Sequence, residues 1–382
     1  MIILKYLTLA LILLNLPTFG LTAFGSTAGS FLSALLFGCI ALYYFLSEKE
    51  ATPLIFVLLG VYYYLISGIN YFGDTREFII DAIKYFIFIV GSISLIRETS
   101  RKELGVVLFI GVLSVIINAF LFSTAYGRYG GLYLNPNRAG LTCLAAFSLS
   151  FIIKHKILKL SVQLIIVVAG IMTLSRYFLL LLFIINVIAI ISNRKNGISL
   201  FAGTFGIILI FSLSSILQLN TERFEAFESL FSDDEVQTET ISRGSRSETW
   251  ALYTDVILEN VLIGQGYKTL HGRQYNNVGV QTGVHNTYLM ALGEAGFILF
   301  FMFIFIYIYL FTKSTKYLRE NVEYVCLSFV LMTFLLVSHN YFDNYLLLFL
   351  TIWLYRRVKN NPLTQVRRHN KEGTTPINPI TF

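Results

Sequence analysis

Residues 283–311 read GVHNTYLMALGEAGFILFFMFIFIYIYLF, a long apolar run behind a short polar entry. A bilayer core of roughly 30 Å takes about 20 apolar helical residues, and the run from 287 to 312 is long enough to cross it. At its start stands His285, an ionisable imidazole where a polar loop meets an apolar helix. This stretch therefore predicts a transmembrane helix with a candidate chemical group at the membrane surface.

The whole chain shares this apolar character. Of its 382 residues, 55% are hydrophobic and 13% are charged, and the mean hydropathy is +0.69. Such a chain has too little polar surface to enclose itself as a water-soluble globule. Because its apolar runs are continuous, they predict helices and not a barrel. We expect an all-α integral membrane protein of about twelve transmembrane helices, with one long extracytoplasmic loop containing short helices.

The expected spans divide the chain into four regions. They lie at 4–22, 28–46, 52–69, 78–96, 104–123, 138–153, 158–174, 177–192, 198–217, 287–312, 322–339 and 341–356. We expect the first to be an uncleaved helix. Residues 1–217 then form N-terminal transmembrane helices and 218–285 form an extracytoplasmic (periplasmic) loop. Residues 286–356 form C-terminal transmembrane helices, and 357–382 form a disordered cytoplasmic tail.

Lys and Arg in the connections indicate the orientation, because basic loop residues remain preferentially on the cytoplasmic side. Of the 29 basic residues, 19 fall in one alternate set of connections. That set contains Lys5, Lys49, Arg97, Arg101, Lys102, Lys154, Lys156, Lys159, Arg194, Lys195, Lys313, Lys316, Arg319, Arg356, Arg357, Lys359, Arg367, Arg368 and Lys371. The other set contains only Arg76, Arg128, Arg138, Arg176, Arg223, Arg243, Arg246, Lys268 and Arg273. Both termini are therefore expected inside and the long loop outside.

Local signals organise the loop before His285. Ser245 and Glu248 have the spacing of a capping box, which predicts a helix from Arg246 to about Asn260. Arg246 then lies in the first turn, beside backbone amides that favour an anion. The Gly264-Gln265-Gly266 stretch predicts the turn that follows.

Three groups of residues resemble a known family. Arg246, the Gly264-x-Gly266 turn and His285-Asn286-x-x-Leu289 with Glu294-x-Gly296 look like the outer-loop signature of the O-antigen ligase and O-antigen polymerase superfamily. Leu134-Asn135-Pro136-Asn137-Arg138-Ala139-Gly140 resembles its Asn-Pro-Asn stretch before a transmembrane helix, and Thr173-Leu174-Ser175-Arg176 resembles its Ser-Arg or Thr-Arg pair. The resemblance covers about residues 130 to 300 by motif. One departure is Val261, where members often have proline.

This resemblance implies an enzyme of the bacterial cytoplasmic (inner) membrane whose active site faces outside. Such enzymes transfer a glycan from polyprenyl diphosphate to an acceptor hydroxyl on another glycan or on lipid A core. Membrane lipid, chain-length regulator proteins and flippase proteins are candidate partners, whereas a nucleic acid is not expected. No cofactor or metal is expected, since the acidic run 233–235 lacks a histidine or a spaced fourth ligand. Direct displacement would invert the anomeric configuration.

Chemistry assigns roles within these motifs. A diphosphate leaving group needs cations, and arginine supplies forked donors that never lose their charge. The candidate catalytic cations are Arg176 and Arg246. His285 is the candidate base, because histidine has the unperturbed pKa closest to neutral pH. The candidate substrate-binding residues are Arg138, Arg243, Asn137, Asn286 and Glu294.

Alternative assignments remain for several of these residues. Arg243 is an alternative to Arg246, and His271 and His339 are rival imidazoles to His285. The alternative role for Glu294 is that of a buried helix-breaking partner instead of an acid. The outer residues Arg76, Arg128, Arg223 and Arg273 favour lipid headgroups or plain solvation.

Two other functions compete with polymerase activity. A ligase would pass the glycan to lipid A core, but it would be expected to have more external basic surface than this chain offers. A transporter or lipid flippase would carry internal repeats, broken helices and charges near the bilayer middle. Only Lys84 and Asp81 suggest such charges, while polarity is concentrated in the outer loop. The sequence therefore favours a polymerase.

Overall fold

The computed structural model describes residues 1–122, 127–201, 203, 205–206, 246–272 and 282–359. Within these ranges every regular element is helical, as expected from the sequence. The N-terminal elements are α1 (Ile2–Leu13), α2 (Leu16–Phe24), α3 (Ser26–Leu46), α4 (Leu54–Ile69), α5 (Thr75–Gly91), α6 (Ile93–Glu98) and α7 (Arg101–Leu121). Next come η1 (Gly131–Tyr133), α8 (Pro136–Ser150), α9 (Lys156–Met172), α10 (Arg176–Ser192) and η2 (Arg194–Ile198). The last are α14 (Arg246–Ala251), α15 (Thr254–Glu259), α16 (Thr287–Thr315), α17 (Val322–Phe334) and α18 (Tyr345–Lys359).

Asparagine side chains cap the starts of α8 and α16, which lie within two of the family-like motifs. The Oδ1 atom of Asn135 accepts hydrogen bonds from the amides of Asn137 and Arg138 at 2.8 and 3.3 Å. At α16, Asn286 Oδ1 accepts from the amides of Tyr288 and Leu289. An N-cap of this kind satisfies amides that have no partner inside the helix. Both starts were predicted within two residues, at 138 and 287.

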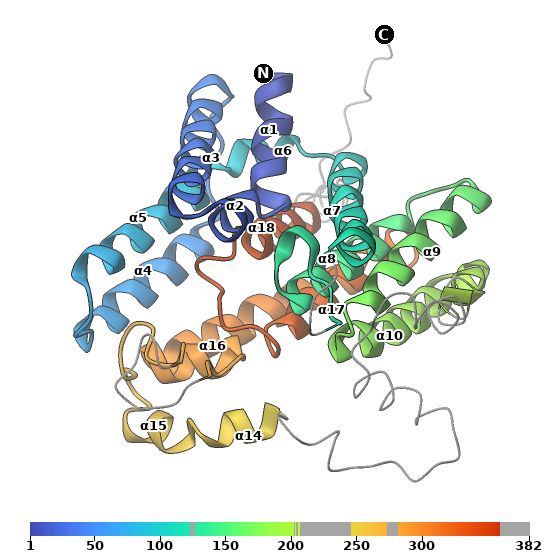
Figure 1. Ribbon diagram of the computed structural model, residues 1–382. Coiled ribbons are helices and arrows are strands. Elements are labelled where there is room, and N and C mark those ends of the chain that lie inside the picture. The colour runs from blue at the N-terminus through green and yellow to red at the C-terminus, as the bar shows by residue number, and fades with distance from the viewer. Residues whose placement is uncertain (123–126, 202, 204, 207–245, 273–281, 360–382) are drawn as a thin grey trace, which may run out of the picture.

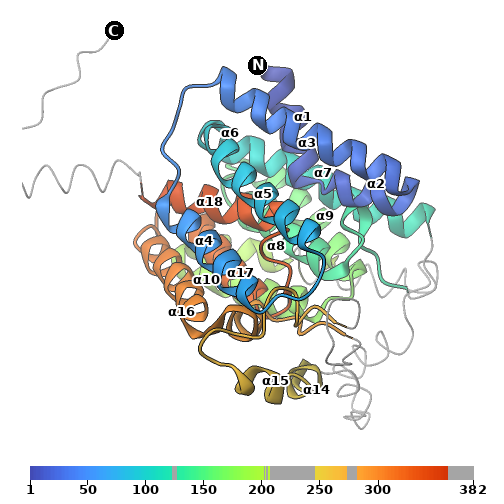
Figure 2. The ribbon, with the colours of Figure 1, turned by 90° about the vertical axis from the view of Figure 1, so that its left-hand side faces the viewer.

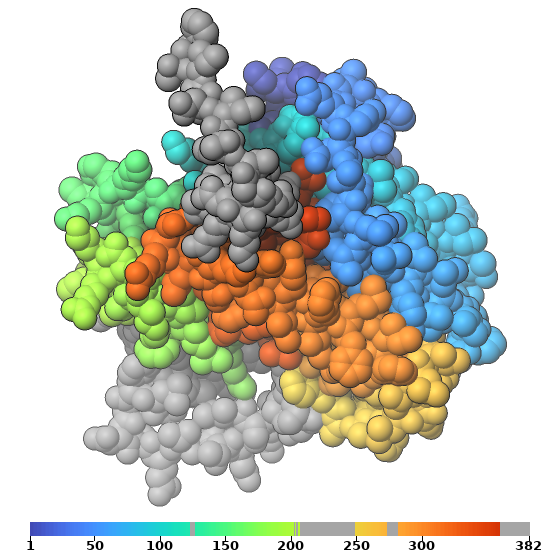
Figure 3. Space-filling model, turned by 180° about the vertical axis from the view of Figure 1, so that it is seen from behind, coloured from blue at the N-terminus to red at the C-terminus, as the bar shows by residue number. Residues whose placement is uncertain are grey.

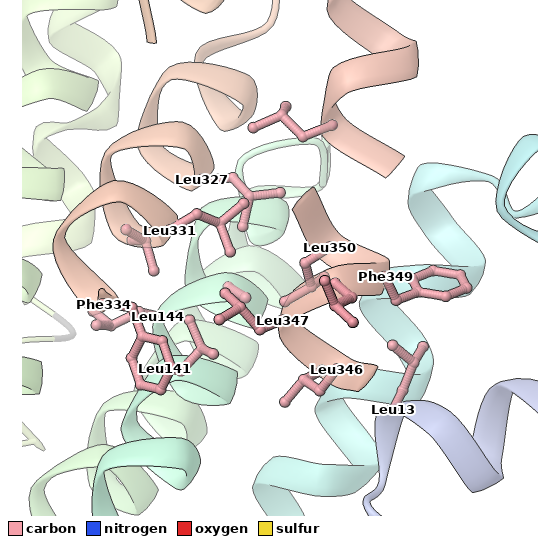
Figure 4. Packing of buried hydrophobic residues seen from close by; sticks show 14 of the residues in the cluster. Leu13, Leu141, Leu144, Leu327, Leu331, Phe334, Leu346, Leu347, Phe349 and Leu350 are labelled. Atoms are coloured by element: carbon pink, nitrogen blue, oxygen red, sulfur yellow. The ribbon is translucent and has the colours of Figure 1, made fainter. Parts of the chain in front are cut away.

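The hydrophobic core lies where α8, α17 and α18 meet. Figure 4 shows the leucine and phenylalanine side chains that interlock there, with Leu13 of α1 at one edge. All of them are almost fully buried. They are Leu13, Leu141, Leu144, Leu327, Leu331, Phe334, Leu346, Leu347, Phe349 and Leu350. The outer turns connect to the ends of these closely packed helices.

The described part of the long loop lies at one end of the helical body. In Figures 1 and 2, α14 and α15 lie beyond α16, at the opposite end from the N-terminus. Figure 3 shows the same pair, in yellow, against the orange surface of α16. The body of the protein therefore separates the N-terminus from the loop helices, an arrangement compatible with the expected orientation.

In the described part of the chain, three helices are long and apolar enough to cross a membrane: α3, α7 and α16. A fourth span is obtained if α1 and α2 are counted together, although they are bent by 64°. The helices α4, α10 and α17 are apolar but shorter. The chain thus has the helices of a membrane protein, but this structure does not confirm the expected number of about twelve spans. The expected span 198–217 lies mostly outside the described residues.

Three expected helices besides the one at 287–312 are interrupted. The first span breaks between α1 and α2, where Asn15 has a left-handed φ of 55° and Pro17 lacks an amide hydrogen. The span 78–96 breaks at Ser92, whose hydroxyl donates to the Phe88 carbonyl. The helix expected from Arg246 to Asn260 is two short helices, with Tyr253 buried at the break. Each break lies at a polar or aromatic residue, Asn15, Ser92 or Tyr253. Helical periodicity alone does not predict the position of such a break.

The loop is fastened to the first turns of α16 by backbone hydrogen bonds. The amides of Gln265 and Gly266 donate to the carbonyls of Gly293 and Glu294 at 2.7 and 3.2 Å, and Phe297 N donates to Val261 O at 3.0 Å. Gly296 interrupts α16 with a φ of 80°, and a Cβ there would collide with the Leu262 carbonyl. The Gly264-x-Gly266 and Glu294-x-Gly296 motifs are therefore two halves of one structural joint.

Two of the predicted regions, the tail and the extracytoplasmic loop, are described only in part. Helix α18 continues to Lys359, past the start expected for a disordered tail at 357. The remainder of that tail, 360–382, lies outside the described residues. Most of the predicted extracytoplasmic region, 218–285, also lies outside them. Its side of the membrane stays a prediction.

Candidate active site

A cavity of about 600 Å³ opens between α10, α17 and the outer turns. It is lined by Arg128, Asn137, Arg176, Tyr177, Leu180, Leu181, Ile184, Thr249, His285, Phe329, Thr333, Leu336 and Val337. Ligand pockets in proteins commonly have volumes of about 300 to 1,000 Å³. The cavity thus brings together Arg176, His285 and Asn137, three residues that the sequence assigned to one site from three separate motifs.

Two neighbouring turns build the polar mouth of the cavity. Arg128 Nε donates to the Thr173 carbonyl at 3.3 Å, and Tyr129 N donates to the Met172 carbonyl at 3.2 Å. The Ser175 hydroxyl donates to Asn137 Oδ1 at 3.1 Å. These bonds hold the starts of α8 and α10 together, so both family-like motifs contribute to the same mouth.

Helix α10 provides the cavity with a charged end and an apolar wall. Arg176 is its first residue, in the turn where the positive end of the helix dipole lies. Tyr177, Leu180, Leu181 and Ile184 recur at helical spacing and extend the same wall. A cationic mouth above an apolar surface can accommodate a molecule that has an anionic head and a hydrocarbon chain.

The loop helix α14 contributes the remaining wall through Thr249. Arg246 is the first residue of α14, three positions before Thr249. Arg246, the candidate selected from the sequence, therefore begins the helix that borders the cavity. Its alternative, Arg243, lies outside the described residues.

His285 stands in an unusual backbone conformation. Its φ is 49°, a left-handed value that a non-glycine residue adopts at an energetic cost. Its amide donates to His339 Nδ1 at 3.2 Å, and the two Nδ1 atoms are 3.1 Å apart. Backbone strain of this kind concentrates where side-chain placement matters. Among the residues that the structure describes, five that are not glycine have positive φ, and four of these lie in the outer turns: Leu134, Leu174, Lys268 and His285.

Behind His285 lies a buried row of polar side chains. The rings of His339 and His271 meet edge to face with centroids 4.8 Å apart. His271 Nε2 lies 3.5 Å from Glu294 Oε1. The opposite oxygen of Glu294 accepts from the Tyr63 hydroxyl at 2.7 Å, and Oε1 accepts from the Leu270 amide at 3.1 Å. The row joins the histidines to α4 and α16.

Burial keeps two of the three imidazoles neutral. It lowers the pKa of His271 to about 3, and Lys268 and His285 add to this effect. It also lowers the pKa of His339 to about 2, with His271, His285 and Arg138 acting in the same direction and Asp343 opposing them. Both rings therefore remain uncharged near neutral pH, and neither lines the 600 Å³ cavity. His285 is the histidine that does.

The other predicted binding residues occupy different places. Arg138 lies in the first turn of α8 and is close enough to influence His339 electrostatically. Asn286 is buried, and its side chain caps α16. Glu294 is fully buried and belongs to the polar row. None of these three lines the cavity, so their substrate-binding roles stay predictions.

Sequence reasoning missed Arg128 as a site residue and treated His339 only as a rival base. Arg128 was attributed to headgroups or solvation, yet it lines the cavity beside Arg176. Its position shortly before the Asn-Pro-Asn motif was the available signal. His339 is distant from His285 in sequence. The contact between their rings depends on the path of the chain after α17 ends at Phe334. No local pattern could have revealed it.

Asp81, which the sequence suggested as a charge within the membrane, binds two residues of the loop, Tyr267 and Lys268. One of its oxygens accepts from the Tyr267 hydroxyl at 2.6 Å and from Lys268 Nζ at 2.9 Å. Lys268 also pairs with Glu77 at 2.7 Å. Paired charges of this kind can be tolerated at membrane depth without serving a transport path. Across the described ranges, no group of three or more His, Cys, Asp or Glu side chains is arranged to hold a metal.

Comparison with known proteins matches a part of the chain that contains the three candidate catalytic residues. A family model described as O-antigen ligase matches residues 141–304, which include Arg176, Arg246 and His285. No curated protein matches the chain. The family implies transfer of a glycan at a membrane. Residues 141–304 thus match the O-antigen ligase family, which supports the resemblance of the motifs to the O-antigen ligase and O-antigen polymerase superfamily.

Proposed function

We propose that this protein is a glycosyltransferase of the bacterial cytoplasmic membrane, acting on the outer side. Its donor is a glycan linked to polyprenyl diphosphate, and its acceptor is a hydroxyl group of another glycan. The observation that carries this proposal is the cavity in which Arg128, Arg176 and His285 stand above an apolar wall. Such a cavity can bind a diphosphate, its lipid chain and a reacting hydroxyl at the same time.

The residues divide the reaction between them. His285 takes the proton of the acceptor hydroxyl as its oxygen attacks the anomeric carbon. The bond from that carbon to the diphosphate oxygen breaks, and its electron pair leaves with the diphosphate. Arg128 and Arg176 hold the growing negative charge through forked hydrogen bonds, and Arg246 adds a third cation from α14. Attack opposite the leaving group inverts the anomeric configuration, without a metal.

Within this class we propose a polymerase. The described outer elements are compact: besides the two short loop helices, they consist of turns, several of which border the 600 Å³ cavity. This leaves room for two similar lipid-linked glycans to meet at His285. A ligase must also hold a large anionic core, which would favour more external basic surface than Lys268, Arg223, Arg243 and Arg273 provide.

Reconstitution separates the two activities. Purified protein in liposomes, given lipid-diphosphate repeat units as the only saccharide, is expected to produce a ladder of longer lipid-linked chains. A metal chelator in the buffer should leave the ladder unchanged. The products can be followed by gel electrophoresis of the released glycans. Transfer that begins only after lipid A core is supplied would instead identify a ligase.

Reporter fusions test the orientation that this mechanism requires. Fusions at Asn193 and Leu363 should report the cytoplasm, and a fusion at Thr238 should report the outside. The physical reason is the concentration of 19 of the 29 basic residues in one set of connections. A paired phosphatase and fluorescent-protein reporter reads both sides. A cytoplasmic Thr238 would contradict the proposed function.

The described charges give a transporter less support. Asp81 is paired with the loop lysine Lys268. Lys84 faces a second cavity of about 610 Å³ that Lys268 and Asp81 also line. The candidate chemical residues gather instead at the outer cavity. The experiment that discriminates is the reconstitution above, because a flippase would move the lipid without lengthening its glycan.

A further inference from the structure

His339 is held beside His285 by bonds from the start of α16. Thr287 N donates to the Leu335 carbonyl at 2.7 Å, and the Thr287 hydroxyl donates to the Ser338 carbonyl at 2.7 Å. These bonds fix the segment between α17 and α18 against the residues that follow His285. On the other side, a Cβ at Gly283 would approach His339 Nε2 to 2.8 Å. The His339 ring therefore occupies a narrow, preformed slot.

The hydrogen bond from the backbone determines which nitrogen of His339 carries its proton. An amide can only donate, so the Nδ1 atom that receives the His285 amide must offer a lone pair. A neutral His339 then carries its proton on Nε2. The same Nδ1 lies 3.1 Å from Nδ1 of His285. That contact is favourable only if His285 Nδ1 carries a proton, which leaves the lone pair of His285 on Nε2.

We propose that His339 is a positioning residue that holds His285 in the tautomer whose Nε2 atom can act as a base. This inference rests on the proposed function, in which His285 takes the proton of the acceptor. When His285 becomes an imidazolium, its Nδ1 proton still has an acceptor in His339. The second imidazole thus does for this base what an orienting carboxylate does in other sites.

The surroundings keep His339 in the state that this role needs. A protonated His339 would turn an Nδ1–H donor toward the donating amide and could not accept a proton from His285. The titratable groups that act electrostatically on the ring come from several elements: His271 and His285 from the loop, Arg138 from α8, and Asp343 from its own connection, which alone favours charge on the ring. Burial disfavours charge on the ring, and the positive group Arg138 acts in the same direction. His339 therefore stays an acceptor near neutral pH.

The tautomer can be observed without any substrate. Protein labelled with nitrogen-15 in its histidine rings gives separate signals for protonated and unprotonated ring nitrogens. At alkaline pH the His285 signals, identified by their absence from the His285→Ala variant, should show a protonated Nδ1 and an unprotonated Nε2. The reverse pattern would overturn the inference and leave the proposed function standing. Absence of transfer by the wild-type protein would defeat the proposed function instead.

Two substitutions test the consequence for catalysis. His339→Phe keeps the ring volume but removes the acceptor, and we expect kcat to fall roughly 10- to 100-fold, as when outer partners of other functional imidazoles are removed, with little change in KM. His339→Asn places an amide oxygen near the position of Nδ1 and should recover most of the rate. Equal, wild-type rates in both variants would overturn the proposal, as would equal inactivity in two folded variants. If His339→Phe does not fold, the asparagine variant and the wild-type tautomer still decide the matter.

Discussion

Replacing His285 with alanine is expected to lower the rate of glycan transfer by about 10² to 10⁴, the usual contribution of a general base. The backbone around His285 is held by the Asn286 cap and by Val284, whose amide donates to the Leu270 carbonyl at 2.9 Å. Loss of the ring should therefore leave the protein folded in the membrane. The measurement is the initial rate of chain extension by purified protein in liposomes.

His155 provides a matched control for this experiment. It is exposed at the start of α9 and does not line the cavity, so His155→Ala should transfer glycan at close to the wild-type rate. The melting temperatures of both variants establish that they remain folded. Wild-type chain synthesis by His285→Ala would show that the base has been assigned wrongly, and His339 would become the next residue to test.

Replacing Arg176 with alanine should cost about 10² to 10³ in kcat, as for other groups that stabilise developing negative charge. Arg176→Lys should recover only part of this loss, because an ammonium group cannot reproduce two parallel hydrogen bonds to phosphate oxygens. The same order of severity is expected at Arg246. Steady-state rates measured at saturating donor separate this effect from weaker binding.

Arg76 is the control for the arginine series. It is exposed at the start of α5 and takes no part in lining the cavity. Arg76→Ala should therefore act like wild type at every donor concentration. If Arg176→Lys were as active as wild type, plain positive charge would suffice at position 176, and forked recognition of the diphosphate by this residue would be excluded.

Helix starts and individual site residues could be predicted because their signals are local. The Asn-Pro pair at 135–136 and the Asn-Thr pair at 286–287 mark starts that the structure confirms. Polar residues beside long apolar runs also indicate where a charged side chain meets a helix end. For this reason Arg176, Asn137 and His285 could be named from motifs, and the structure brings all three to one cavity.

The bends and the buried polar row could not be predicted in the same way. The break at Asn15 and the kink at Gly296 depend on which backbone atoms another segment offers. Glu294 resembles a site residue in sequence, yet it is fully buried against Tyr63 and Leu270. The roles of such residues follow from contacts between distant parts of the chain, about which periodicity and spacing carry no information.

The joint between the loop and α16 cannot form until the first turns of α16 have been synthesised. Residues 261–266 bind backbone groups of Gly293, Glu294 and Phe297, all of which leave the ribosome later than the loop itself. His339 is made later still, after α17. Because chains grow from the N-terminus, the cationic helix ends are present before the base has its neighbour. Under the proposed mechanism, a partly synthesised chain therefore lacks a complete site until the C-terminal helices have been made.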